Sequence, residues 1–281
     1  MDGIALWQAI VLGIVEGITE FLPVSSTGHL TITEQLMGIP IDDVAVTAYT
    51  AIIQVGAIAA AIIYFWRDIV RIVVSFVKGL FNAEARTTSD WRLSLAVVVG
   101  SIPIAVIGLA LKHVIEGPLR SLWVVAAGLI LWSGVMIFAE RAATQARREG
   151  DIGVKDGLII GLVQCVALIP GVSRSGATIS AGLLRDLDRV TATRLSFFLG
   201  IPALTAAGLL EAVSAKDDIS ARVGWVPTAL GTVVSFVVAY ASIAWLLRFV
   251  STNSIVKFVW YRVGLGLLLI AGLVFGVLSA T

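Results

Sequence analysis

Six long apolar stretches without a charged side chain constrain this chain more than any other feature. Most of them approach or exceed the ~20 residues that an α-helix needs to cross a hydrocarbon core of ~30 Å. Only 14% of all residues are charged, whereas a soluble domain carries roughly a quarter. The sequence therefore predicts an all-α polytopic membrane protein with six spans, over residues 47–66, 93–111, 121–139, 195–210, 223–247 and 263–281.

Composition argues against several functional classes. The single cysteine, Cys165, rules out an intramolecular disulfide and a cysteine-based metal cluster, and it reads as a small apolar packing residue. A net charge of +1 without a dense basic run gives no indication of nucleic-acid binding. The N-terminus opens with Asp2 in place of a basic segment, so we expect no cleavable signal peptide.

Two further apolar segments, residues 3–15 and 157–169, are too short to span. Each has 13 residues and reaches only about 20 Å as a helix. A polar break and a second short apolar piece follow each of them, near residues 30–33 and 177–184. This pattern predicts two re-entrant helical hairpins, because irregular backbone at membrane depth is tolerated only where it is buried in protein or faces water.

The two breaks resemble each other. With an offset of 148 and no gap, "GIVEGITEFLPVSSTG" (13–28) aligns with "GLVQCVALIPGVSRSG" (161–176), and Glu16 faces Gln164. We interpret the chain as one membrane domain, 1–281, built from two repeats, 1–148 and 149–281. Each repeat holds one hairpin and three spans, so the number of crossings is odd and the repeats are expected to have inverted topology.

Basic residues predict the orientation. Fourteen Lys and Arg side chains fall on one side of the predicted spans, and four fall on the other: Lys112, Arg120, Lys216 and Arg222. The positive-inside rule makes the first side cytoplasmic. Both termini and the first hairpin would then open to the outer face. Residues 67–81 carry charges at Arg71 and Lys78 within an apolar stretch, which is typical of a helix lying in the membrane interface.

The first break combines carboxylates, hydroxyls and a histidine. Glu16 and Glu20 are i and i+4, so they share one helical face. Ionisable groups at membrane depth usually line a cavity or a pathway. The pair suits a hard divalent cation, or one carboxylate suits a general base. Hydroxyls and a glycine after Pro23 suit a backbone nest for an anion, and His29 is a candidate to activate a serine, to act as a nucleophile itself or to protonate a leaving group.

The second break supplies the opposite charge. Arg174 lies between Ser173 and Ser175, and Gly171 and Gly176 allow close backbone approach. A guanidinium, hydroxyls and a helix N-terminus in one loop form a phosphate site by ordinary electrostatics. The alternative is an arginine that pairs structurally with one of the glutamates. Because the repeats are related, we expect both breaks to contribute to one site.

The two breaks carry a family resemblance. "EGITEFLPVSSTGH" (16–29) and "PGVSRSGAT" (170–178) resemble the signature motifs of the bacterial undecaprenyl-diphosphate phosphatase family, the bacitracin-resistance type of integral membrane lipid phosphatase. "IIQVGAIAA" (52–60) and "YRVGLG" (261–266) fit the same family. The resemblance implies removal of the terminal phosphate from undecaprenyl diphosphate, a divalent cation (Mg²⁺ or Ca²⁺), the bacterial plasma membrane and a site that opens outward. It also implies that Glu16, Glu20, Ser26 and His29 act with Ser173, Arg174 and Thr178.

These observations give one predicted site. Its catalytic residues would be Glu16, Glu20, Ser26, His29 and Arg174, and the two glutamates would also hold the metal. Substrate binding would fall to Ser25, Thr27, Gly171, Ser173, Ser175, Gly176 and Thr178. Ser26 is slightly favoured as the nucleophile, and His29 remains the alternative. A polyprenyl-phosphate transporter or flippase is the competing function, because inverted repeats with meeting hairpins also suit alternating access. The oligomeric state stays open, a homodimer included.

Overall fold

The computed structural model describes residues 4–41, 43–111, 114, 119, 121–214 and 219–280. Within these ranges the chain is helical and contains no strand, apart from an isolated bridge between Arg147 and Leu187. Gly3 and Thr281, and Lys112, Arg120 and Lys216 of the predicted outer side, lie outside the described residues. In the described part of the chain six helices are long and apolar enough to cross a membrane, as predicted: α3 (Val44–Tyr64), α5 (Ser89–Ala110), α7 (Leu122–Ala142), α10 (Arg189–Ser214), α12 (Trp225–Val250) and α13 (Val256–Val274).

Four of the spans begin earlier than the sequence indicates, and the difference is largest for α10 and α13. Helix α10 starts at Arg189 and α13 at Val256, because basic residues that seemed to bound the apolar stretches lie inside the helices. Arg189 bonds to Glu140, which lets a charged residue occupy the first turn of α10. Arg262 is fully buried inside α13 instead of flanking it. Helix α13 ends at Val274, and Gly276 (φ +68°) turns the chain back.

Two pairs of short helices surround the polar breaks. The first pair is α1 (Leu6–Thr19) and α2 (Ser26–Leu36), and the second is α8 (Val154–Gln164) and α9 (Arg174–Leu184), with a 3₁₀ turn over Cys165–Leu168 after α8. Helix α9 covers the residues 148 positions after α2, and α8 starts 148 positions after α1. Helices α2 and α9 each have 11 residues. The aligned segments thus share their helix starts and the bounds of the second helix, whereas a 3₁₀ turn at the end of α8 takes the place of the last turn of α1.

Each leading short helix packs closely on a span from the other half of the chain. Helix α1 lies on α12, and α8 lies on α5. A Cβ added to Gly13 would come within 2.6 Å of the Gly231 carbonyl oxygen, and one added to Gly161 within 2.1 Å of the Gly100 carbonyl oxygen. Small residues therefore let the backbones touch, as they do between helices in membranes.

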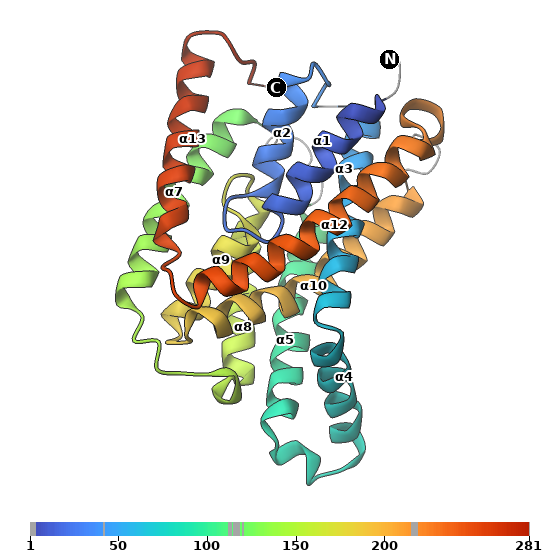
Figure 1. Ribbon diagram of the computed structural model, residues 1–281. Coiled ribbons are helices and arrows are strands. Elements are labelled where there is room, and N and C mark those ends of the chain that lie inside the picture. The colour runs from blue at the N-terminus through green and yellow to red at the C-terminus, as the bar shows by residue number, and fades with distance from the viewer. Residues whose placement is uncertain are drawn as a thin grey trace.

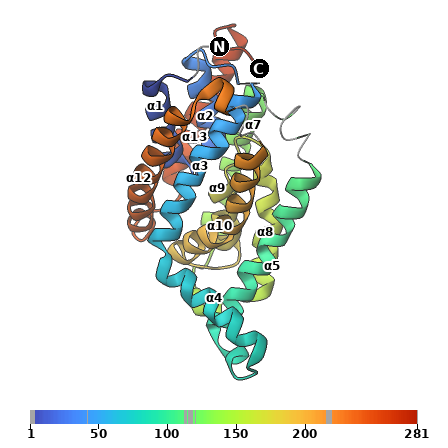
Figure 2. The same cartoon turned by 90° about the vertical axis from the view of Figure 1, so that its right-hand side faces the viewer.

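The long helices run between two opposite ends of the molecule. Helices α7 and α13 run side by side along one flank, and the start of α1 lies at the same end as the end of α13 (Figure 1). Helix α4 (Trp66–Phe81) pairs with the first part of α5 into a hairpin that projects at the opposite end (Figures 1 and 2). The expected helix over 67–81 is therefore present, with an exposed apolar face that includes Trp66, Val70 and Val77. Its position in the membrane interface stays a prediction.

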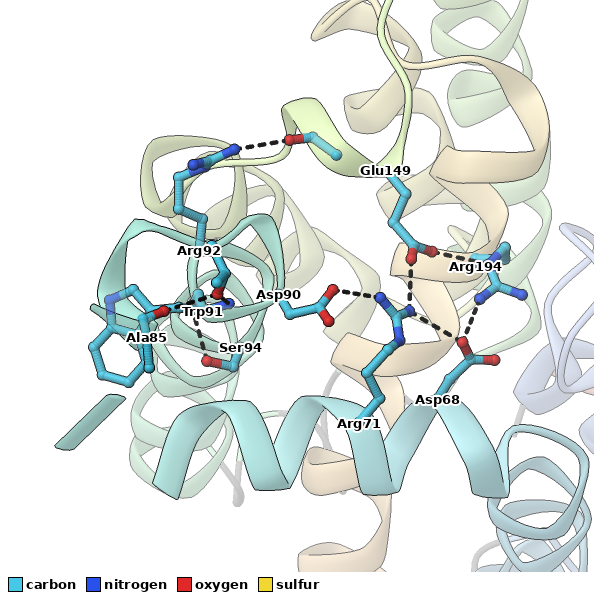
Figure 3. A network of polar contacts seen from close by, with 11 residues as sticks. Asp68, Arg71, Ala85, Asp90, Trp91, Arg92, Ser94, Glu149 and Arg194 are labelled. Atoms are coloured by element: carbon cyan, nitrogen blue, oxygen red, sulfur yellow. Dashed lines mark hydrogen bonds and ion pairs between the residues drawn. The ribbon is translucent and has the colours of Figure 1, made fainter. Parts of the chain in front are cut away.

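An ion-pair network ties this projecting hairpin to the body (Figure 3). Arg71 on α4 bonds to Asp90 at 2.6 Å and to Glu149 at 2.6 Å, and Arg194 on α10 bonds to Asp68 at 2.8 Å and to Glu149 at 3.1 Å. The five side chains are 25–37% exposed. Single surface pairs contribute little to stability, but a network of shared partners restricts four elements at once.

Asp156 in the first turn of α8 is a second anchor. Its side chain is 3% exposed and accepts hydrogen bonds from Arg147 (2.7 and 3.0 Å), from Arg185 Nε (2.8 Å) and from the Gly153 amide (3.0 Å). Burial by itself raises the pKa of the Asp156 carboxyl. The hydrogen bonds from Arg147, Gly153 and Arg185 outweigh this effect and bring the pKa to about 2, below its ordinary 3.8.

The Asp156 contacts predict a pH-dependent stability. Because the folded-state pKa is depressed, the stabilisation is present above about pH 4 and is lost as the pH falls through about 2. We expect Asp156→Asn to be less stable than wild type by roughly 1–3 kcal/mol at pH 7. The thermal unfolding midpoint in detergent should also fall less for this variant between pH 4 and 2. Exposed Glu84→Gln is the control; an Asp156→Asn curve parallel to that of wild type would contradict the assignment.

Candidate active site

The first break begins where α1 ends. Glu20 continues the helical conformation, and its amide donates to the Glu16 carbonyl oxygen at 2.9 Å, so the two carboxylates lie one turn apart. Pro23 lacks an amide proton and cannot continue the ladder. Ser25 then adopts φ +77°, and its Oγ accepts the Gly28 amide at 3.4 Å to cap α2. A left-handed serine at this position turns the chain sharply into the second helix.

The second break also turns at a serine with positive φ that caps the following helix. Gly171 has φ +92°, Ser173 has φ +77°, and Ser173 Oγ accepts the Gly176 amide at 3.1 Å to cap α9. Ser173 is 148 positions after Ser25, and the two serines share one backbone conformation. Residues other than glycine pay roughly 1–2 kcal/mol to enter this region. Its recurrence at aligned positions shows that both breaks require the same sharp reversal.

The two turns bond directly to each other. The Gly171 amide donates to Ser25 Oγ at 3.2 Å, and Ser175 Oγ donates to the Leu22 carbonyl oxygen at 2.8 Å. These contacts join segments that are about 150 residues apart in sequence. The predicted convergence of the two breaks is therefore correct.

Glu20 is the centre of the polar contacts. Its Oε2 accepts Ser26 Oγ at 2.6 Å and Gln54 Nε2 at 3.1 Å, and its Oε1 accepts Arg174 Nη2 at 3.2 Å. Arg174 also donates through Nη1 to the Ser196 carbonyl oxygen at 3.0 Å. The hydroxyl, the carboxylate and the guanidinium thus come from α2, the end of α1 and α9, and Gln54 from α3 lies beside them. The structure therefore contains both arrangements that the sequence suggested. The two breaks contribute to one site, and Arg174 pairs with a glutamate, Glu20.

Glu16 lies in a different environment. Its carboxylate is fully buried, and neither oxygen has a hydrogen-bond partner among the residues that the structure describes. Glu16 lines a cavity of about 320 Å³, which adjoins a lobe of about 140 Å³ lined by Glu20 and Arg174. Ser26 and Gln54 line both volumes. An unpaired carboxylate in such a place is costly unless a cation or a proton accompanies it.

His29 lines neither the cavity nor its lobe. Its Nδ1 lies 2.7 Å from the Ser25 carbonyl oxygen, which only accepts, so Nδ1 carries the proton. In the neutral ring Nε2 is then the acceptor, and the Tyr261 hydroxyl donates to it at 2.6 Å. The two rings also stack with centroids 5.5 Å apart. Both ring nitrogens are therefore occupied.

The predicted residues divide into two groups. Those that line the cavity or its lobe are Glu16, Glu20, Ser25, Ser26, Thr27, Ser173 and Arg174. The others, which do not line it, are His29, Gly171, Ser175, Gly176 and Thr178. Thr178 is fully buried and donates to Ser196 Oγ at 2.6 Å, and Ser175 is fully buried in the turn–turn contact. Ser175 thus helps to join the two breaks, and Thr178 joins α9 to α10.

Sequence reasoning assigned no role to Gln54, Tyr261 or Arg262. Gln54 donates to Glu20, Tyr261 donates to His29, and Arg262 bonds to both turns. The sequence could have indicated Gln54 and Arg262, because a side-chain amide or guanidinium inside an apolar span is rare and usually functional. Ser196 contacts Arg174 through its backbone carbonyl oxygen, and no residue type would have indicated that.

Comparison with known proteins identifies the family of this chain. The family model described as bacitracin resistance protein BacA matches residues 9–268. The chain belongs to this family. A relative named undecaprenyl-diphosphatase from Cutibacterium acnes is 58% identical, covering 97% of this chain and 99% of the relative. Undecaprenyl-diphosphatase 1 from Streptomyces avermitilis is 57% identical, covering 99% and 100%. Together with the six apolar helices, membership of the BacA family makes the chain a multi-pass membrane protein.

The serine cap of this BacA-family chain can be tested at Ser25. Ser25→Ala removes the acceptor of the Gly28 and Gly171 amides and keeps a Cβ at φ +77°, so it should destabilise the protein by about 1–2 kcal/mol. Ser25→Gly loses the same acceptor but adopts this φ freely, so its cost should be smaller. Thermal unfolding in detergent checks the order wild type, Gly, Ala. An Ala variant as stable as the Gly variant would show that the left-handed backbone is not strained.

Proposed function

We propose that this chain hydrolyses undecaprenyl diphosphate to undecaprenyl phosphate and inorganic phosphate, which returns the lipid carrier to cell-wall synthesis. The relatives named undecaprenyl-diphosphatase over nearly the full chain support this function. The observation that carries it is the 2.6 Å hydrogen bond from Ser26 Oγ to Glu20, whose other oxygen meets Arg174. A hydroxyl next to a base and a guanidinium is the minimum set for in-line attack on a phosphate.

In the proposed reaction Ser26 is the nucleophile and Glu20 is the general base. Ser26 Oγ forms a bond to the terminal phosphorus, the bond from that phosphorus to the bridging oxygen breaks, and the serine proton passes to Glu20. Undecaprenyl phosphate leaves with the bridging oxygen. Water then hydrolyses the phosphoserine and releases inorganic phosphate. His29 is the less suitable nucleophile, because its Nδ1 donates to a carbonyl oxygen and its Nε2 accepts from Tyr261.

Arg174 and two helix N-termini are proposed to bind the phosphates. Arg174 now donates to Glu20 and to Ser196, and an entering diphosphate would compete for these donors. Helices α2 and α9 begin at Ser26 and Arg174, and residues at both N-termini line the lobe beside Glu20. Amide groups at helix N-termini favour anions. Transfer of Arg174 from Glu20 to the substrate would leave Glu20 a stronger base at the moment when Ser26 must lose its proton.

A divalent cation fits the residues on one side of the site. Glu16 has two buried oxygens without a partner among the described residues, which is the donor chemistry that Mg²⁺ or Ca²⁺ prefers. Glu20 is less available, since both of its oxygens already accept hydrogen bonds. Among the residues described, no three His, Cys, Asp or Glu side chains gather into one cluster. A bound cation would neutralise phosphate charge, with Glu16 as its main protein ligand and Glu20 as the second.

The membrane arrangement follows from the proposed repeats. We infer that α1–α2 and α8–α9 are re-entrant hairpins of two inverted repeats in the plasma membrane, with both termini and the site opening on the outer face. The shared serine caps and helix bounds support this interpretation. Apolar residues that include Leu30, Leu168 and Leu204 line the cavity together with the polar groups, which suits a lipid diphosphate with its tail among the helices. A homodimer stays a prediction.

The reaction is tested with purified protein and undecaprenyl diphosphate in detergent. Wild type should release phosphate and lose this activity on chelation, and Mg²⁺ or Ca²⁺ should restore it. Ser26→Ala and Glu20→Gln should lower kcat by about 10²-fold or more, because they remove the nucleophile and its base. Ser242→Ala on α12, whose hydroxyl donates to the Val238 carbonyl oxygen of the same helix, is the matched control.

Two outcomes of this assay would overturn parts of the proposal. Near-normal turnover by Ser26→Ala would exclude serine as the nucleophile, and phosphate trapped on His29 would replace it. A wild type that binds the lipid and releases no phosphate would favour the transporter. The Ser26–Glu20 contact favours the hydrolase, since transport requires no nucleophile beside a base.

The orientation is tested by labelling introduced cysteines in a Cys165→Ser background. Pro40 lies between α2 and α3, and Glu84 lies between α4 and α5, and both are exposed. A membrane-impermeant maleimide added to intact cells should label Pro40→Cys and leave Glu84→Cys unlabelled until the cells are lysed. Labelling of both from outside would contradict the predicted topology.

A further inference from the structure

Arg262 is the largest fully buried side chain of the described protein, and the proposed chemistry does not use it. It lies on α13, in a helix that carries no other residue of the predicted site. Its guanidinium makes five hydrogen bonds. Nε donates to Ser133 Oγ at 3.2 Å and Nη1 to the Pro23 carbonyl oxygen at 3.0 Å, while Nη2 lies 3.0–3.3 Å from the carbonyl oxygens of Gly128, Gly171 and Val172.

The positions of the five acceptors show which segments Arg262 connects. Pro23 belongs to the turn between α1 and α2, and Gly171 and Val172 belong to the turn before α9. Gly128 and Ser133 lie on α7. One planar group therefore joins both turns to each other and to a membrane-spanning helix.

Burying the Arg262 guanidinium costs free energy, which indicates that its hydrogen bonds have a role. All five acceptors are uncharged, and in the described part of the chain the guanidinium meets these acceptors without an ion pair to a carboxylate. A buried guanidinium without a counter-ion loses its hydration and recovers only hydrogen bonds. The group satisfies carbonyl oxygens that the two breaks leave without helical partners, and it does so with the rigid fork geometry that only arginine has.

We propose that Arg262 is a positioning residue for the phosphatase reaction: it fixes the two turns relative to each other, and thereby Ser26 and Glu20 relative to Arg174. This inference rests on the proposed function. The direct turn–turn bonds from Gly171 and Ser175 join the turns at two points, and Arg262 adds a third connection that is anchored on α7. Small displacements of reacting groups lower turnover strongly, by about 10²-fold for roughly 1 Å.

The test compares Arg262→Lys and Arg262→Met with wild type. Lysine keeps the charge but has one donor atom, so it cannot bond to both turns in this geometry. If bridging is the role, both variants should lose about 10- to 100-fold in kcat for phosphate release, with KM within about threefold. Arg248→Lys, an exposed arginine at the end of α12, is the control and should keep wild-type kcat.

Several results would overturn the proposal. Recovery of kcat by lysine to within twofold would mean that only the charge matters. A lower unfolding temperature with wild-type kcat per folded protein would mean that Arg262 has a purely structural role. If neither Arg262 variant folds, Ser133→Ala carries the test, because it frees only Nε; a three- to tenfold lower kcat supports the positioning role, and an unchanged kcat refutes it.

The wild-type assay separates this inference from the proposed function. Phosphate release by wild type upholds the hydrolase, whatever the variants do. If wild type releases no phosphate, the proposed function fails whatever the Arg262 variants do. The positioning role is then tested by calorimetry, which measures how tightly each protein binds inorganic phosphate. About tenfold weaker phosphate binding by both Arg262 variants would still support the positioning role, and unchanged binding would reject it.

Discussion

The need to satisfy backbone polar groups where helices break inside an apolar protein governs this structure. Each break leaves carbonyl oxygens and amides without helical partners, and such groups are costly away from water. Serine caps at Ser25 and Ser173 accept amides, the Gly171 amide bonds to Ser25, and Arg262 donates to the carbonyl oxygens of both turns. The breaks satisfy one another, and this is why they must meet.

The same requirement creates the conditions for chemistry. Turns that meet bring two helix N-termini to one cavity, together with the side chains at the start of each helix. Ser26 and Arg174 begin α2 and α9, and both contact Glu20. The polar groups are shielded from water, so their charges interact more strongly than on a surface. A phosphatase site is thus compatible with a lipid environment without a separate soluble domain.

Charged residues at the periphery of the protein have different partners from those at its centre. Arg71, Arg194, Arg147 and Arg185 pair with carboxylates at or near helix ends outside the central site. Arg174 and Arg262 lie at the breaks, and the first is the only one of these two with a carboxylate partner among the described residues. Glu16 keeps an unpaired carboxylate in the cavity, with no partner in the described ranges. Peripheral pairs hold the helices, whereas the central groups are left able to bind ions.

The sequence by itself determined the number of spans, the two short segments and their internal relation, because hydrophobic length and the spacing of helix breakers act locally. It also indicated Glu16, Glu20, Ser26 and Arg174 as one group, since polar residues are costly within apolar segments and usually serve a site there. It failed at Arg262, where a charge at the edge of an apolar run suggested a helix boundary although the residue is buried inside α13. Only the tertiary structure decided that Ser26 bonds to Glu20 and that His29 bonds to Tyr261, 232 positions away. The Ser26–Glu20 bond depends on how the turn between α1 and α2 folds back, and the His29–Tyr261 bond depends on packing between helices far apart in sequence; the apolar pattern encodes neither.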